Sequence, residues 1–179
     1  NDAQAYVLEF TDLKLRFIKD QVPVKETAKN ITGVSIAAQT VITSVAHGYT
    51  DDDEIFIYDI VGPDSLNGKS YFVSDKTTDT YKLKDVDGNY ISTVGLSAYV
   101  SGGTSEKIYE IVTPYAEAED LTKIQVSQNA DTMYIVHPSY QPRKLTRTSS
   151  TNWALATFTG TSFPFTTANN FPAAVAFAQ

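Results

Sequence analysis

The chain of 179 residues contains no cysteine. That absence excludes disulfide bonds, thiolate metal sites and thiol nucleophiles, and it leaves the redox compartment open. Long apolar stretches are missing too: no window approaches the roughly 18 consecutive apolar residues of a membrane span, and the first residues lack the basic and apolar regions of a secretion signal. Histidine is scarce, because His47 and His137 are the only two. Only these two side chains could therefore act as the histidine base of a nucleophilic site.

Basic charge is also in short supply. The 14 Lys and Arg residues face 21 Asp and Glu residues, which gives a formal net charge of -7. An acidic protein repels nucleic-acid phosphate, whereas nucleic-acid binders carry a basic patch. General DNA or RNA binding is therefore disfavoured. The apolar content of 42% is sufficient for a real core, and the length suits one ordinary domain or two small ones.

Apolar and polar residues alternate over short stretches. Leu13, Leu15 and Phe17 alternate with basic residues, and residues 81–84 follow the same pattern. Denser runs rich in Val, Ile, Tyr and Phe occur at 6–8, 55–60, 71–73, 108–112 and 133–136. Such stretches predict strands when turn-forming pairs separate them, here His47-Gly48, Asn67-Gly68, Asp87-Gly88 and Gly102-Gly103. The pattern predicts an all-β fold, either a sandwich or a barrel.

One segment favours a helix. Residues 114–121 begin with Pro114, follow Thr113 as the predicted N-cap, and carry acidic residues in the early turns. We expect one or two helical turns, which must dock on the sheet because so short a helix is marginal alone.

The composition changes twice along the chain. Residues 31–107 form a series of short strands with Gly, Asp and Asn turns, whereas the flanks carry longer aromatic strands. We therefore predict a small β-barrel at 31–107 inserted into an outer, discontinuous β domain formed by 1–30 and 108–179. Residues 158–179 are rich in Thr, Pro and Asn and predict a connector to a further region. The missing initial Met and the apolar last residues lead us to expect a piece of a longer protein.

The first candidate site runs from His47 to Glu54. Histidine and carboxylates hold hydrolytic metal ions, so His47 with Asp51, Asp52 and Asp53 has suitable chemistry. Consecutive residues of a turn point in different directions, however, and no HExxH motif supplies two ligands on one helix face. We therefore predict a turn in which Gly48 supplies the bend and the acids are solvated. A weak structural cation at 51–54 stays open as the alternative.

Two further candidates contain acidic or imidazole groups. Asp85 and Asp87 alternate as calcium ligands do, but an EF-hand loop needs Gly at its sixth position and Glu at its twelfth. Gly88 stands fourth and Leu96 twelfth, so a hairpin turn at Asp87-Gly88 is predicted instead. His137 ends an apolar run, and the chain has no GxSxG motif that would supply a nucleophile for it to activate. A structural imidazole is therefore favoured, which either forms hydrogen bonds within the chain or faces a partner.

The remaining candidates are surface side chains. Arg143, Lys144 and Arg147 lie near Tyr140 in the one basic cluster, and such clusters can grip phosphates. Lys144 and Arg147 are an odd number of residues apart, so one strand cannot present both on one face, and ion pairs with the surplus acids are favoured. Exposed aromatic residues would make a platform for a sugar or peptide; the candidates are Tyr49, Tyr58, Tyr71, Tyr90 and Tyr99.

Two resemblances rest on these stretches. Residues 46–49 (AHGY), 54–57 (EIFI), 66–71 (LNGKSY) and 101–104 (SGGT) resemble the small barrel called the first catalytic cysteine half-domain of ubiquitin-activating enzymes, a module that also recurs in bacteriophage proteins. Such a module carries no nucleophile, and this chain has no cysteine, so ubiquitin chemistry is not implied.

The flanks resemble the amino-terminal region of tail nozzle proteins, also called packaged-DNA stabilisation proteins, of short-tailed phages. The matching stretches are 6–10, 15–17, 108–115, 124–138, 143–147 and 171–177. The resemblance implies a non-enzymatic structural component of a phage or prophage virion, made in the bacterial cytoplasm. Expected partners are copies of itself in a ring and other tail or portal proteins, with DNA passing without specific binding. The resemblance implies no catalytic residues, no cofactor-binding or metal-binding residues, no contact with a membrane and no small-molecule substrate. The alternative function is a carbohydrate- or peptide-binding β module on a virion or cell surface.

Overall fold

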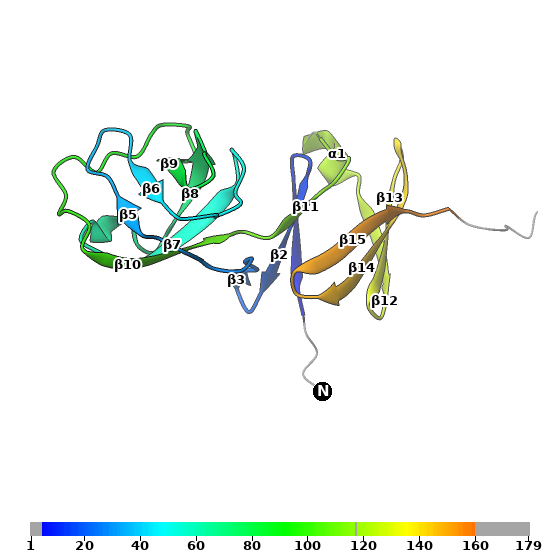
Figure 1. Cartoon of the computed structure of the whole chain (residues 1–179). Helices are drawn as coiled ribbons and strands as arrows, with labels where there is room; N and C mark the ends of the chain where they lie inside the picture. The colour runs from blue at the N-terminus through cyan, green and yellow to red at the C-terminus, as the bar shows by residue number, and fades with distance from the viewer. Residues whose placement is uncertain (1–4, 117, 160–179) are drawn as a thin grey trace, which may run out of the picture.

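The computed structural model describes residues 5–116 and 118–159, and the regular structure in this part of the chain is mostly β (Figure 1). The prediction of an all-β fold with one short helix is confirmed. None of the described helices is long and apolar enough to span a membrane. The predicted connector at 158–179 lies outside the described residues, apart from its first two.

One sheet curls into a small barrel. Its strand order is β4-β10-β7-β8-β9-β6-β5. The bounds are β4 (Lys29–Asn30), β5 (Gly33–Val34), β6 (Val41–Thr43), β7 (Glu54–Val61), β8 (Lys69–Ser74), β9 (Thr80–Lys84) and β10 (Ser101–Lys107), with a 3₁₀ turn at Asp64–Leu66. The first and last strands in this order are two halves of one segment, 29–34. Its Ile31 N–H donates to the Gly103 carbonyl at 2.9 Å and its Thr32 N–H to the Thr43 carbonyl at 2.8 Å, so the segment joins both ends of the sheet and closes the barrel.

The barrel forms because alternate residues of its strands are apolar. In β9, Tyr81 and Leu83 point inward and are fully buried, while the lysines between them are not. The same alternation buries Ile55 and Ile57 of β7. These side chains share one core with the inward residues of the other strands, and every buried member of that core lies between Ile31 and Leu83.

The glycine pair at 102–103 was wrongly predicted as a turn, because both glycines lie inside strand β10. An added Cβ at Gly102 would lie 2.7 Å from the Asp59 carbonyl oxygen, and one at Gly103 would lie 2.7 Å from Cγ1 of Ile60. Glycine stands here because neighbouring strands approach closely, which sequence spacing alone does not distinguish from a turn.

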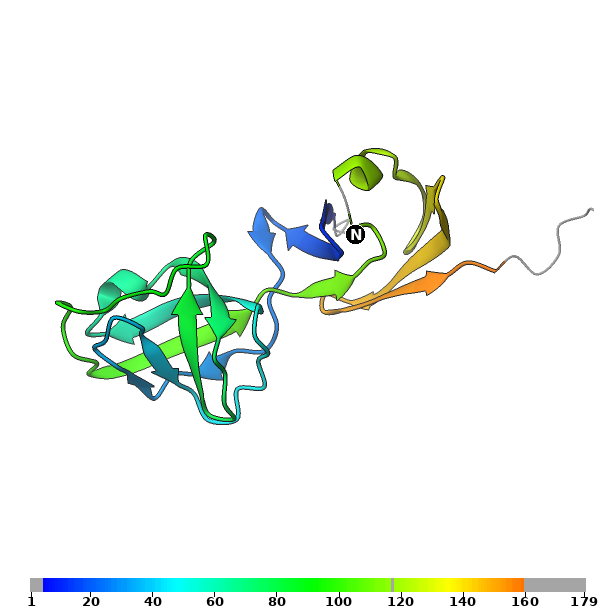
Figure 2. The ribbon, with the colours of Figure 1, turned by 90° about the horizontal axis from the view of Figure 1, so that it is seen from above.

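Two four-stranded sheets build the rest of the described chain. The first has the order β1-β2-β11, with β3 also paired to β2, and the second the order β12-β13-β14-β15. The bounds are β1 (Val7–Thr11), β2 (Lys14–Lys19), β3 (Val22–Pro23), β11 (Glu110–Val112), β12 (Gln125–Asn129), β13 (Thr132–His137), β14 (Tyr140–Ser149) and β15 (Asn152–Thr157). Their facing sides enclose a second core around Leu15, Phe17, Ile135 and Leu145. We call these two sheets, with the helix, the outer unit (Figure 2).

The helix α1 spans Ala118–Thr122, four residues later than predicted. Thr113 and Pro114 do not start it. The Thr113 N–H donates to the Leu13 carbonyl, and the Leu13 N–H donates to the Tyr115 carbonyl. This segment therefore stays tied to the β1–β2 turn, with the Tyr115 ring fully buried, before the helix begins. Leu13 itself lies in that turn with a φ of 57°, so it is not the strand residue that its spacing predicted.

The chain passes twice between the barrel and the outer unit. The two passages pair with each other, since the Glu26 N–H donates to the Lys107 carbonyl and the Tyr109 N–H to the Val24 carbonyl. Ion pairs add to this junction: Arg16 contacts Glu54 at 2.7 Å and Lys107 contacts Glu26 at 3.8 Å. The domain boundaries at 30/31 and 107/108 stay a prediction.

Candidate functional site

His47 and Asp53 form hydrogen bonds and an ion pair within the barrel. The buried His47 accepts a hydrogen bond at Nδ1 from the Tyr49 N–H (3.0 Å), which leaves the proton on Nε2 to be donated to the Thr77 carbonyl (3.1 Å). Asp53 accepts the Thr50 N–H at 2.8 Å and pairs with Lys107. The predicted turn is present, but Asp53 is buried rather than solvated because its charge is paired. Within 5–116 and 118–159, no three His, Cys, Asp or Glu residues cluster as a metal site would require.

The turn at 85–89 has the predicted hairpin geometry. The Asp85 N–H donates to the Asn89 carbonyl, Gly88 has a φ of 82°, and Lys84 bridges to Tyr90 across the turn. The Asp85 carboxylate folds back onto the turn and accepts hydrogen bonds from the N–H groups of Asn89 and Asp87. The bond from Asn89 is the main reason why the pKa of Asp85 lies below its usual value.

His137 and the basic cluster are engaged within the outer unit. The His137 Nδ1 accepts the Ser139 N–H at 3.0 Å, and its Nε2 lies 3.5 Å from Asp120 of α1. Lys144 faces the opposite side of β14 from Arg143 and Arg147, as its spacing predicted. Arg143 donates to Thr157, so these side chains do not form one basic surface.

The proposed tyrosine platform is not assembled on the barrel surface. Tyr49 and Tyr71 belong to the barrel core, being 4% and 5% exposed. Burial is the largest cause that raises the pKa of Tyr49 to about 12, and the same cause raises the pKa of Tyr71. Tyr90 and Tyr99 are half-buried, and their hydroxyls bond to Asp75 and to main-chain carbonyls.

The outer unit has an open side, which the composition of its strands did not predict. In the described residues, β1 and β12 each pair with only one neighbour and so have a free edge. All five residues of β12 are exposed, and the strand has no charge and no proline. Natural sheets usually protect a free edge with charge, proline or a covering segment, because it is a template for another strand.

The side chains beside these edges face the core but are not covered. Val126 and Gln128 of β12 pair with Ile135 and Met133, so they share the face on which Ile135 is fully buried. Val126 is nevertheless 55% exposed. On β1, Leu8 is only half-buried although its cross-strand partner Phe17 is completely buried. The core of the outer unit is therefore incompletely covered beside β1 and β12.

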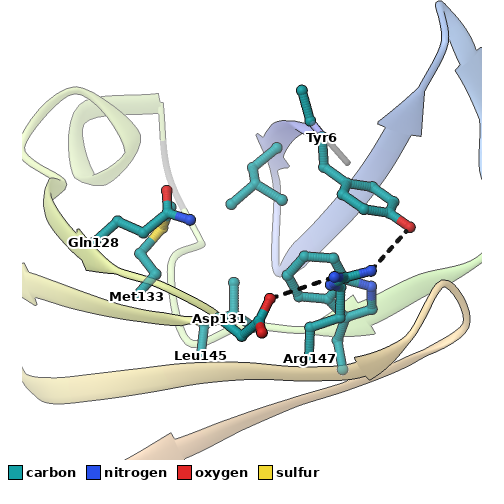
Figure 3. A pocket seen from close by; sticks show the side chains of 9 residues that line it. Tyr6, Gln128, Asp131, Met133, Leu145 and Arg147 are labelled. Atoms are coloured by element: carbon teal, nitrogen blue, oxygen red, sulfur yellow. Dashed lines mark hydrogen bonds and ion pairs between the residues drawn. The ribbon is translucent and has the colours of Figure 1, made fainter. Parts of the chain in front are cut away.

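A cavity of about 230 Å³ marks the open side, and its walls come from both sheets (Figure 3). Leu8 of β1 and Gln128 of β12 line it together with the apolar side chains of Met133 and Leu145. We call this feature the β1–β12 groove.

Arg147 borders one end of the groove. Its guanidinium contacts Asp131 at 3.3 Å and the Tyr6 hydroxyl at 3.4 Å, as Figure 3 shows, and it lies over the Tyr6 ring. Desolvation opposes the charge on Arg147, but the bonds to Asp131 and Tyr6 outweigh it and raise the pKa of the guanidinium. The rings of Tyr6 and Trp153 meet edge to face at 5.2 Å, and Trp153 stacks on Phe17 at 4.3 Å. This end is therefore a rigid aromatic wall with a fixed positive charge.

Within residues 5–116 and 118–159, β1 and β12 each have one edge without a strand partner, and apolar side chains line the cavity between them. Such an arrangement binds an extended polypeptide, through main-chain hydrogen bonds at the edge and side-chain burial beneath. No protein-family model matches this chain, and no curated protein matches it.

Proposed function

We propose that this chain is a non-enzymatic structural component of a phage or prophage tail, of the nozzle or hub type, that works in the virion through contacts with copies of itself and with other tail or portal proteins. The observation that carries the proposal is the open side of the outer unit. A protein that works alone gains stability by covering core-facing residues such as Val126 and by protecting a free strand such as β12.

The distribution of polar side chains supports the same proposal. His47, Asp53 and Glu54 bond to main-chain groups or to Lys107 and Arg16, and the cavity that Asp51, Asp52 and Asp53 line also contains the side chains of Lys14 and Lys107. The acidic net charge of -7 also suits a wall past which DNA moves without sticking, since fixed negative charge repels phosphate. A sugar-binding platform has less support, because two of its five tyrosines are buried in the barrel core.

The proposal is tested by the association of the purified chain. Sedimentation velocity over a wide concentration range should show an oligomer larger than a dimer, and negative-stain electron microscopy should show closed rings. Electrophoresis with duplex DNA at physiological salt should show no retarded band. A chain that stays monomeric at all concentrations, or one that binds DNA tightly, would refute the proposal.

A further inference from the structure

A second cavity lies on the barrel, beside the first half of strand β8. Residues 69–72 of β8 pair with β7, whereas β9 pairs with β8 only through residues 72–74. Strand β9 ends at Lys84, where the chain enters the turn at 85–89. Residues of β8 and of the segment 85–92 together line a cavity of about 660 Å³, which is within the range of roughly 300–1,000 Å³ typical of ligand pockets. We call it the β8 cavity.

The lining of the β8 cavity includes apolar core residues and one aromatic ring at the surface. Leu66 and Tyr71 belong to the barrel core and are almost fully buried. Phe72 lines the cavity from the outer face of β8, because successive residues of a strand point to opposite faces and Tyr71 points inward. Phe72 is only half-buried, so part of its ring is open to a ligand. Such a ring gives a large contact area at low entropy cost.

Ser70 brings uncharged hydrogen-bonding groups to the cavity. The Val73 N–H donates to the Asp53 carbonyl, and the Val73 carbonyl accepts the Asp52 N–H, so the main chain of Val73 faces β7. Main-chain groups an odd number of residues apart face opposite sides of a strand. The N–H and carbonyl of Ser70 therefore face the side where, among the described strands, β9 does not reach. Its exposed hydroxyl adds a group that both donates and accepts.

The charges around the β8 cavity are balanced. Its lining contains two cationic side chains, Arg16 and Lys69, and two anionic ones, Glu54 and Asp85, so their formal charges sum to zero. Arg16 and Glu54 pair at 2.7 Å, and the Asp85 carboxylate accepts main-chain N–H groups of its own turn. A strongly charged ligand would meet as many repulsive as attractive groups. The lining therefore favours a ligand that is polar but neutral.

We propose that the β8 cavity binds a neutral saccharide, with the Phe72 ring against the apolar face of a sugar and Ser70 bonded to sugar hydroxyls. A saccharide combines the features that the lining calls for, because its ring carbons form an apolar face and its hydroxyls both donate and accept hydrogen bonds. The site differs from the tyrosine platform considered above, since the surface ring is Phe72 and Tyr71 is buried. The inference goes beyond the proposed function and does not depend on the association of copies.

A microarray of immobilised oligosaccharides, probed with the full chain, tests the inference. The array carries neutral oligosaccharides of hexoses, deoxyhexoses and N-acetylhexosamines beside sialylated and sulfated ones of matched size. We expect binding to at least one neutral oligosaccharide and no preference for the acidic ones. The neutral oligosaccharide with the strongest signal is then titrated into isotope-labelled protein, where the NMR signals of the Ser70 and Ser92 amides, which border the cavity, should shift. An array without a bound neutral oligosaccharide, or shifts confined to residues outside the cavity, would overturn the proposal.

A variant of Phe72 assigns the binding to this cavity. Phe72→Leu removes the ring but keeps an apolar side chain, so the affinity for the same oligosaccharide should fall about three- to tenfold while the far-ultraviolet circular dichroism stays unchanged. The matched control is Phe56→Leu, because Phe56 is also half-buried on the outer face of the barrel, on the neighbouring strand β7, but does not line the cavity. Its affinity should stay that of the unaltered chain. An unchanged affinity in Phe72→Leu, or an equal loss in both variants, would overturn the proposal.

Discussion

Replacing Gly103 by alanine tests whether the segment 29–34 closes the barrel. Gly103 has a φ of 97°, and an added Cβ would lie 2.7 Å from Cγ1 of Ile60 and 3.1 Å from Cβ of Ile31. Carbon atoms in contact normally lie about 3.5–4.0 Å apart. The positive φ costs about 1–2 kcal/mol for a residue with a side chain, and overpacking costs about 1–3 kcal/mol more. Gly103→Ala should therefore destabilise the protein by about 2–5 kcal/mol.

Gly88→Ala is the matched control. Gly88 has a φ of 82°, but an added Cβ would meet nothing within 4 Å, so only the backbone cost of about 1–2 kcal/mol applies. Urea unfolding followed by circular dichroism gives both changes in the free energy of unfolding. Amide exchange adds a local measurement, because the Ile31 N–H that bonds to Gly103 should exchange faster in Gly103→Ala. Equal destabilisation by the two variants would refute the close packing of Ile31 and Ile60 on β10, and with it the closed barrel.

Three further predictions concern the barrel core and a turn. Ser105→Ala should cost about 1–3 kcal/mol in urea unfolding, because the Tyr81 hydroxyl loses its acceptor in the core; Ser101→Ala, at an exposed position of the same strand, should change stability little. The pKa of Tyr49 is raised from its ordinary value of 10 to about 12 in the fold. The contribution of this group to the free energy of unfolding is therefore complete below pH 10 and is lost as the pH rises through 12. A urea midpoint that stays constant between those pH values would contradict this. The ionised Asp85 carboxylate stabilises the turn above its ordinary pKa of 3.8, and this stabilisation is lost as the pH falls through the lowered pKa of the folded state. An NMR titration of the carboxyl should show a midpoint below 3.8. An ordinary midpoint would refute the hydrogen bonds from the main chain.

Strands with strict alternation could be predicted from the sequence because burial enforces a period of two. Tyr81 and Leu83 are both fully buried, as their spacing indicated. Strand β10 was missed, since its two glycines are selected by close approach of other strands and not by a turn. The start of α1 was misplaced because Tyr115 is held in the second core before the helix begins, and a local capping pattern does not record that tertiary contact.

The groove could not be predicted for a related reason. Strand β12 (QVSQN) has no apolar alternation, so neither its strand character nor its inward face is visible in the sequence. Val126 becomes informative only once pairing places it beside Ile135 on a face that is buried in the next strand. Conversely, His47 and Asp53 drew attention through their chemistry, and their hydrogen bonds to main-chain groups account for them without a ligand.

The barrel and the outer unit differ in whether their edge strands have a pairing neighbour. The segment 29–34 joins the edge strands of the barrel, because its main chain bonds to Gly103 of β10 on one side and to Thr43 of β6 on the other. Strand β12 has no charge and no proline, and no described strand pairs with its outer edge, which in a protein that acts alone would favour aggregation. An edge of this kind is retained when another strand regularly occupies it. In the described part of the chain, the segment 29–34 thus bonds to both ends of the barrel sheet, whereas the outer unit presents a strand edge beside the β1–β12 groove.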